Sequence, residues 1–365
     1  MINNFFKIHK YFNYLLQFNK IVILWISCVY CYAKPAKFYL YIPNNYIADA
    51  TINRFQKESR AMVVQNFFNE PEEMIAKIAT GVSGYDVIVA TSYAVDALIK
   101  INKIKRLDWN KISNISQINP KYLNQKYDPH NLYSIPYAFT PVLIGYNVDK
   151  MKVLDINPDS WQVFFDPKYL KKLKGHITLL ASPRNVFAAA LLYLHKDPNT
   201  NNLKDIEMAY EVMKQAMPYW TKFDSDNYYR GLMRGDIWIA MGYSEDFYKT
   251  IVDLSIAHSK IKIDVQLQKE GNMSELDNLV IMSSSNHNNL SYQFINTVLE
   301  QQSQLELINI TGASIPSTLD VTKMASYRPW MYPKNMIVFK SYSPRIRSLI
   351  DELWLELTMT CSKEK

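Results

Sequence analysis

Polar and aromatic side chains recur in this sequence directly after short apolar runs, and their types suit the binding of a small polar ligand. The set combines tyrosines, amides, hydroxyls, carboxylates and one arginine. Its members are Asn44, Tyr46, Ser92, Tyr93, Ser182, Arg184, Asn185, Tyr243, Glu275 and Asp277. Each has an ordinary use as well, such as capping a helix for Ser92 or packing for the tyrosines. Their recurrence after successive runs predicts a ligand-binding lining rather than a catalytic set.

The motifs of common enzyme classes are absent or incomplete. Residues 242–246 (GYSED) begin like the G-x-S-x-G turn that presents a nucleophilic serine, but Asp246 replaces the second glycine that this turn needs. No H-E-x-x-H, Walker or G-x-G-x-x-G motif occurs, and the histidines lack metal-ligand spacing. Two alternatives stay open: a hydrolase that uses Ser244, and a ferric-ion receptor that uses the adjacent phenols of Tyr228 and Tyr229.

Apolar, strand-like runs alternate with helix-like segments along the chain, which predicts an α/β fold. Strands are expected over residues 37–42, 62–67, 86–90, 176–181, 237–241 and 279–282. Helices are expected over residues 47–58, 70–80, 93–100, 186–195 and 291–306. Because strand–helix–strand units place parallel strands side by side, we expect mostly parallel sheets flanked by helices.

Residues 133–147 differ in character from the other apolar runs. This long stretch is interrupted by proline and has no helical period, so it predicts a strand that crosses between two lobes. A second change of character comes near residues 269–277. Two crossings make both lobes discontinuous in sequence and put a cleft between them. Ligands of open α/β sheets bind beyond the carboxyl ends of the strands, where the candidate residues fall.

The crossings define the expected domains. The first lobe is expected to comprise residues 34–141 and about 278–320, and the second lobe residues 142–277 and about 321–365.

The first 33 residues have the layout of an export signal. They carry three lysines and no acid, and they end in a thirteen-residue apolar run, residues 21–33, that closes on Ala33. This run is shorter than the about 20 residues that cross a bilayer, so a cleavable signal is expected, with an uncleaved N-terminal anchor as the alternative. The C-x-x-C pair of Cys28 and Cys31 falls inside this segment and is not expected to bind metal.

The net charge of +7 over 365 residues does not indicate a nucleic-acid partner. Without the three lysines of the N-terminal segment, 38 basic and 34 acidic residues remain over 332 residues, a net charge of +4. The one compact basic run, residues 168–174, is expected to be a solvated loop. Nine glycines leave little room for phosphate-binding loops, and three cysteines are too few for a disulfide scaffold or a thiolate cluster. We expect no cofactor and no resident metal.

At these residues the sequence resembles the periplasmic polyamine-binding proteins, the spermidine and putrescine receptors of ABC uptake systems. The resemblance runs over residues 38–355 and is best at 84–96, 133–147, 223–244 and 269–282. It implies the type II periplasmic-binding-protein fold, two α/β lobes closing on a ligand. It also implies a periplasmic, non-enzymatic monomer that delivers a polyamine to an ABC permease and meets a membrane only through its signal or anchor or at the permease.

The family holds a polyamine between carboxylates and aromatic rings, and the resemblance carries four of these positions to this chain. Tyr46 and Tyr93 match family tyrosines, Tyr243 stands where the family has tryptophan, and Asp277 matches the aspartate that grips an amine. The aspartate is therefore the first residue expected to contact a ligand.

Other positions depart from the family pattern. They hold Pro43, Asn44 and Asn45 (for tryptophan, a hydroxyl residue and glutamate), Ser182 and Asn185 (for acids), Glu275 (for an aromatic) and Ala313 (for tyrosine). With carboxylates and aromatic walls lost, polyamines with three charges are expected to bind poorly. A diamine, another small cation, or a zwitterion whose carboxylate meets Arg184 is an equal candidate. A degenerate receptor kept for signalling or surface interaction is a further possibility.

Overall fold

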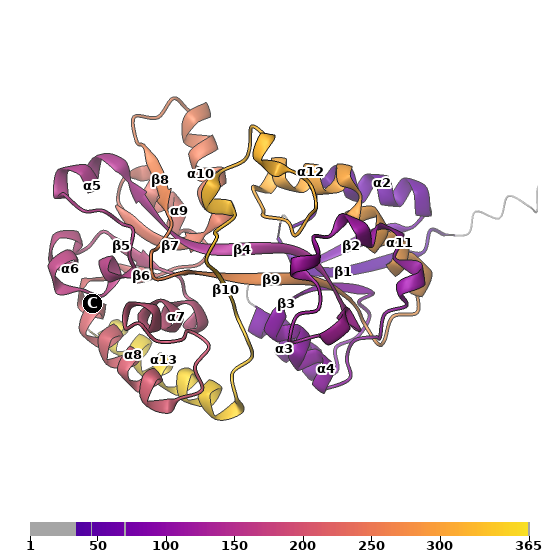
Figure 1. Ribbon diagram of the computed structural model, residues 1–365, viewed down its shortest axis with the longest axis horizontal. Coiled ribbons are helices and arrows are strands. Elements are labelled where there is room, and N and C mark those ends of the chain that lie inside the picture. Colours follow the sequence, from indigo (N-terminus) through magenta and orange to yellow (C-terminus); the bar gives the residue numbers. More distant parts are fainter. Residues whose placement is uncertain (1–33, 45, 69–70, 364–365) are drawn as a thin grey trace, which may run out of the picture.

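A single mixed sheet runs the length of the molecule, with a group of helices at each end (Figure 1). The computed structural model describes residues 34–44, 46–68 and 71–363. The expected signal with Cys28 and Cys31, and also Asn45, lie outside the described residues. Among the described residues, no helix combines the length and the apolar character needed to cross a membrane.

The strands of the described chain form one ten-stranded sheet. They are β1 (Lys37–Pro43), β2 (Met62–Phe68), β3 (Val87–Thr91), β4 (Ser134–Asn147), β5 (Ile177–Leu179), β6 (Lys222–Phe223), β7 (Ile239–Tyr243), β8 (Ile263–Gln266), β9 (Asn272–Ile281) and β10 (Met336–Val338). Their order is β2-β1-β3-β9-β4-β7-β5-β6, with β8 on β4 and β10 on β9. The outer strands pair in parallel, whereas β4 and β9 pair antiparallel with each other and with their neighbours β3, β7 and β8.

The helices cover both faces of the sheet at each end. They are α2 (Asp49–Ser59), α3 (Pro71–Ala79), α4 (Ser92–Lys100), α5 (Val148–Leu154), α6 (Pro167–Leu173), α7 (Pro183–Tyr193), α8 (Leu203–Ala216), α9 (Tyr228–Arg234), α10 (Ser244–Ile256), α11 (Asn288–Leu299), α12 (Gln301–Thr311) and α13 (Pro344–Lys363). At one end α2 and α11 lie on one face and α3 and α4 on the other (Figure 1). The predicted α/β class is therefore confirmed.

The crossing strands β4 and β9 join the two ends into one sheet. Residues 134–141 of β4 pair with residues 280–274 of β9, with a bulge between Pro136 and Ala138. The strand predicted at 279–282 is only the last part of β9, which begins at Asn272. The prediction was too short because Glu275, Asp277 and Asn278 interrupt the apolar run, and the structure puts these polar groups in the interior between the lobes.

The apolar core is divided in the same way as the sheet. One set of buried clusters joins residues 38–139 to residues 276–315, and two of these clusters pack on the two faces of β1 and β3. A separate cluster joins residues 142–273 to residues 330–357 and takes in Tyr93 alone from before residue 142. This division supports the lobe boundaries expected from the sequence, and we propose the lobes on that basis.

Two local predictions were wrong. The helix expected over 291–306 is two helices, α11 and α12, because Glu300 between them has extended backbone angles (φ −59°, ψ 142°). The basic run 168–174, expected to be a solvated loop, lies mostly in α6, which Asp166 caps and which buries Leu170 and Leu173. Its lysines remain exposed.

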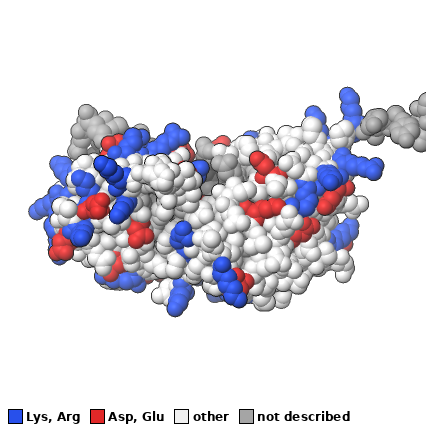
Figure 2. Space-filling view, turned by 90° about the horizontal axis from the view of Figure 1, so that it is seen from above, with Lys and Arg blue, Asp and Glu red and all other residues white. Residues whose placement is uncertain are grey.

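Lys and Arg side chains do not gather into one stripe on the face shown in Figure 2, where they are interspersed with Asp and Glu. This distribution gives no support to a nucleic-acid-binding surface on that face.

Candidate functional site

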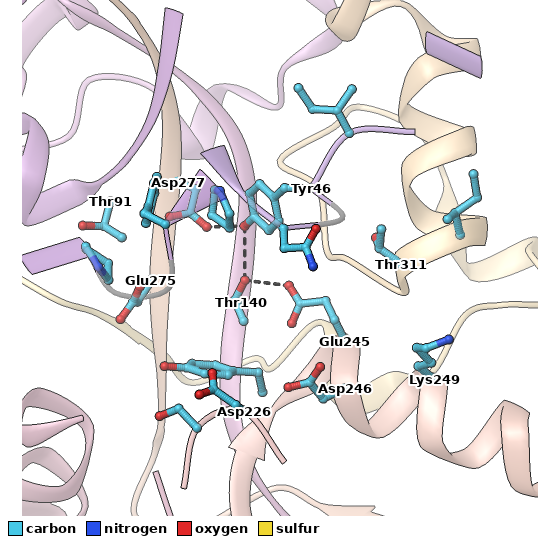
Figure 3. A pocket seen from close by; sticks show the side chains of 18 of the residues that line it. Tyr46, Thr91, Thr140, Asp226, Glu245, Asp246, Lys249, Glu275, Asp277 and Thr311 are labelled. Atoms are coloured by element: carbon cyan, nitrogen blue, oxygen red, sulfur yellow. Dashed lines mark hydrogen bonds between the residues drawn. The ribbon is translucent and has the colours of Figure 1, made fainter. Parts of the chain in front are cut away.

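A cavity of about 470 Å³ opens between the two lobes, and polar side chains from both lobes and from both crossing strands line it (Figure 3). Its described acidic lining comprises Asp49, Asp226, Glu245, Asp246, Glu275 and Asp277. The one basic residue of the described lining is Lys249. A site with six carboxylates and one ammonium group is suited to a ligand that carries positive charge.

The elements bring these groups together for a topological reason. The parallel strands β1, β3 and β7 end at the cavity, so that Tyr46, Thr91 and Tyr243 reach it from the two lobes. Acidic residues at the start of α10 follow β7 immediately. The crossing strands contribute from the middle of their length, β4 through Thr140 and β9 through alternate residues that point to one face.

A chain of hydrogen-bond contacts joins the lobes across the cavity (Figure 3). The hydroxyl of Tyr46 donates to Oδ2 of Asp277 and lies 3.3 Å from Oγ1 of Thr140. Thr140 in turn donates from Oγ1 to Oε1 of Glu245 at 2.7 Å. The first-lobe tyrosine, both crossing strands and helix α10 are thus linked through the side chains that face the ligand space.

Two of the carboxyl groups have raised pKa values, which a bound cation would lower. Burial raises the pKa of Glu245 to about 8, although the hydrogen bond from Thr140 opposes the rise. Burial likewise raises the pKa of Asp277 to about 6, against the hydrogen bond from Tyr46. An ammonium group placed beside these carboxyls favours their ionised form and offsets the cost of burying them.

Tyr228 fixes the geometry at the other side of the cavity. Its ring is fully buried, and its hydroxyl donates to Oδ2 of Asp246 at 2.7 Å and accepts from the backbone N–H of Tyr243 at 2.7 Å. Gly242 makes this possible, because a Cβ there would lie 2.1 Å from Cε2 of the Tyr228 ring. The tyrosine therefore positions an acid and an aromatic residue of the lining.

This arrangement removes the support for iron binding by Tyr228 and Tyr229. Burial, then the nearby Asp246, raises the pKa of Tyr228 well above its usual range, so a phenolate ligand would be costly to form there. Its hydroxyl is also committed to two hydrogen bonds. In the part of the chain that the structure describes, no cluster of three or more His, Cys, Asp or Glu side chains could hold a metal ion.

The hydrolase alternative finds equally little support. Ser244 is fully buried, and its Oγ donates to Oε2 of Glu245 at 3.0 Å. No histidine is among the described residues that line the cavity. Among the described lining residues the serine therefore has no histidine to activate it, and its hydrogen bond holds the Glu245 side chain.

Five of the predicted site residues line this cavity: Asn44, Tyr46, Tyr243, Glu275 and Asp277. Their contact with a ligand stays a prediction. The structure nevertheless brings them together as the sequence pattern suggested.

Ser182 and Asn185 do not line the cavity but lie behind Tyr243. Ser182 caps α7 by accepting from the backbone N–H of Asn185. The Asn185 side chain donates to Oγ of Ser182 at 3.1 Å and to the Tyr243 hydroxyl at 3.4 Å. The expectation of direct lining is corrected for both, because the cap turns them toward the start of α7, where they support Tyr243 instead.

Tyr93 and Arg184 line a different cavity, of about 400 Å³. The Arg184 guanidinium stacks 3.6 Å from the centroid of the Tyr342 ring and donates to Oδ1 of Asn199 at 2.7 Å and to the Lys340 carbonyl at 2.8 Å. These partners, which the sequence pattern could not reveal, draw the arginine away from the acidic cavity. The expectation that it meets a ligand carboxylate there is therefore corrected.

Ser92 also lies outside the acidic cavity. Its Oγ donates to the Phe339 carbonyl at 2.8 Å rather than capping α4. Thr91 occupies the cap position of that helix and makes no capping hydrogen bond. The Tyr93 hydroxyl donates to Oε1 of Glu72 at 3.0 Å. This end of α4 therefore links the first lobe to the segment before α13 and to α3.

Several residues of the described lining are not among those expected from the sequence: Asp49, Thr140, Asp226, Glu245, Asp246 and Lys249. The two acids that follow β7 could have been found by position, because they come directly after a strand that ends at the cleft. Asp226, Asp49 and Lys249 carry no such signal, since only the tertiary fold brings their loops and helices to the cavity.

Two lobes that share crossing strands and enclose a charged cavity define a binding protein that captures a small solute in a cleft. The chain matches the family of bacterial extracellular solute-binding proteins over residues 50–336, and it belongs to that family. The family resemblance seen in the sequence is thus confirmed.

The individual proteins that this chain is similar to are named for the binding or transport of polyamines. The chain is 36% identical over 331 residues to a putrescine/cadaverine-binding protein of Pseudomonas aeruginosa, covering 88% of this chain and 94% of the relative. It is 31% identical to the putrescine-binding periplasmic protein SpuD of the same species, over 84% of this chain and 86% of the relative. Among solved structures, a putative spermidine/putrescine ABC transporter protein from Listeria monocytogenes superposes with a TM-score of 0.79 at 25% identity, covering 89% and 99% of the two chains.

Proposed function

We propose that this protein binds a short diamine, of the putrescine and cadaverine class, in the acidic cavity and delivers it unchanged to an ABC permease. The observation that carries the proposal is the lining itself, in which six described carboxylates surround the ligand space beside Tyr46 and Tyr243. The relatives named for putrescine or cadaverine binding support the same ligand class.

The crossing strand and helix α10 supply an acidic group for each end of a diamine. Asp277 and Glu275 on β9 receive one ammonium group, and Glu245 and Asp246 on α10 receive the other. A hydrogen bond between charged partners contributes about 1.5–3 kcal/mol, and a cation–π contact about 0.5–2 kcal/mol. The ligand joins the crossing strand β9, which pairs with β3 of the first lobe, to helix α10 of the second lobe, and it favours their approach because both groups of acids share one dication.

The protein acts in the periplasm and has an ABC permease as its partner. The N-terminal segment directs export, after which the protein works as a periplasmic monomer, free or tethered by an uncleaved anchor. It needs no cofactor and catalyses no reaction, and its macromolecular partner is the permease rather than nucleic acid. The relative that is named a periplasmic protein supports this location.

Calorimetric titration with putrescine, cadaverine, spermidine and a panel of amino acids tests the proposal. We expect micromolar or tighter binding of the diamines, about −8 kcal/mol or more favourable. Asp277→Asn should weaken diamine binding at least tenfold, whereas Glu207→Gln, which alters an exposed acid of α8 outside the cavity, should not. Binding of an amino acid without diamine binding would overturn the proposal, and so would an Asp277→Asn variant with unchanged affinity.

A further inference from the structure

The charges of the cavity lining are unevenly distributed along its length. Of the labelled charges, Glu275 and Asp277 lie at one side, Glu245, Asp246 and Asp226 at the middle, and Lys249 at the opposite side near Thr311 (Figure 3). The sixth acid of the described lining, Asp49, begins α2, which packs on α12. A positively charged ligand therefore meets attraction over most of the cavity and repulsion at one end.

The position of the lysine follows from helix α10. Glu245 and Lys249 are four residues apart, so they lie on the same face of the helix, with the lysine about 6 Å further along the axis. The hydrogen bond from Thr140 fixes Glu245 at the middle of the cavity. One helical turn thus separates the last acid that a ligand reaches from the ammonium group beyond it.

The lysine charge is only weakly neutralised. Its ion-pair partner among the described residues is Asp253, one further turn along α10, with Nζ 3.6 Å from Oδ2. The two side chains are 66% and 40% exposed, and ion pairs of this kind contribute little. Because that partner is absent from the described lining, the positive charge is left to act on the ligand space.

We propose that Lys249 is a specificity-determining residue that disfavours a third positive charge in the cavity, so that diamines are accepted and triamines such as spermidine are discriminated against. This inference rests on the proposed function. A diamine uses the acids of β9 and of α10, whereas the extra aminopropyl arm of a triamine has to extend past Glu245 toward the lysine. The repulsion there acts on the longer ligand more than on the shorter one.

The test compares the affinities of spermidine, putrescine and cadaverine by calorimetry for the wild type, Lys249→Gln and Lys100→Gln. We expect Lys249→Gln to raise the ratio of spermidine to putrescine affinity about five- to tenfold, an effect that shrinks as salt is added. Lys100 is the matched control, because it is 68% exposed and pairs with an acid four residues away, Asp96, but lies outside the cavity. Its substitution should leave the ratio unchanged.

Two results would overturn the inference while leaving the proposed function intact. One is tight diamine binding with the same spermidine-to-putrescine ratio in the wild type and in Lys249→Gln. The other is binding of the free amino acids lysine or ornithine to the wild type but not to Lys249→Gln. The Lys249 side chain would then bind a ligand carboxylate instead of repelling a ligand ammonium group. A wild type that binds no diamine at all would instead refute the proposed function itself.

Discussion

Glu245 stands at one end of three oxygen–oxygen contacts that run through Thr140 and Tyr46 to Asp277. With both acids ionised, the two hydroxyls supply two protons for three contacts. Because Tyr46 donates to Asp277 and Thr140 donates to Glu245, the 3.3 Å contact between the two hydroxyls is left without a proton. Burial raises the pKa of Glu245 to about 8, although the hydrogen bond from Thr140 favours the ionised form.

A pH dependence of ligand affinity follows from these groups. Because the free protein holds a proton on Glu245 below about pH 8 and an ammonium ligand favours the carboxylate, binding should release a proton and affinity should rise as the pH increases toward 8. Asp277 adds a similar rise below about pH 6. Titrations in buffers of different ionisation enthalpy measure the proton release.

The substitution Glu245→Gln is the control for this prediction. It should lower diamine affinity and remove the rise in affinity above about pH 6, while the part due to Asp277 remains. Observed enthalpies that are the same in every buffer would contradict the assignment.

At the scale of elements, the close packing of α9 against β7 positions two residues of the cavity lining, Tyr243 and Asp246. Gly242 in β7 lets the Tyr228 ring of α9 lie against the strand, and the phenol then holds both Asp246 and the backbone of Tyr243. The acid of α10 is therefore oriented by a residue that never reaches the ligand space.

Tyr228→Phe should separate this positioning role from simple packing. Loss of the hydroxyl removes its hydrogen bonds to the Asp246 carboxylate and from the Tyr243 N–H, which should cost about 1–3 kcal/mol of unfolding free energy and weaken diamine binding severalfold. Chemical denaturation and calorimetry measure the two effects. Tyr229→Phe, at the adjacent half-buried tyrosine, should change neither, and an equal effect of both substitutions would argue against the positioning role.

The sequence predicted strands correctly where an unbroken apolar run marked them. Strands β1, β3 and β7 are apolar runs, so both their existence and the polar residues at their ends could be predicted. Strand β9 was shortened because its polar residues serve the cavity and break the apolar pattern. Arg184 was misplaced because its partners, the Tyr342 ring and the Lys340 carbonyl, are more than 150 residues away in the chain. Lys249 shares a face of α10 with Glu245, but the sequence alone does not show that this face lines the cavity.

At the scale of the whole molecule, acids of the crossing strand β9 and of helix α10 face a common space. Asp277 is carried by a strand that pairs with the first-lobe strand β3, and Glu245 by a helix packed on the second lobe. A dication bound between them favours a compact arrangement, since separation of the lobes would leave each acid without its partner.

Small-angle scattering should therefore show a smaller radius of gyration with putrescine than without it. The decrease should be absent in Asp277→Asn at the same ligand concentration, and Glu207→Gln should behave like the wild type. A decrease that persists in Asp277→Asn would mean that closure does not depend on the bridging acid, and no decrease in any variant would contradict closure on the ligand.

The pairing of β4 with β9 also affects the order in which the two lobes can fold during synthesis. The first lobe needs β9 between β3 and β4, and the second lobe needs α13, whose Ile346, Ile350 and Leu357 complete its core. During synthesis both cores stay unfinished until residues beyond 281 and then 357 have emerged. A nascent chain therefore exposes apolar surface from both lobes at once, and the second lobe completes its core last.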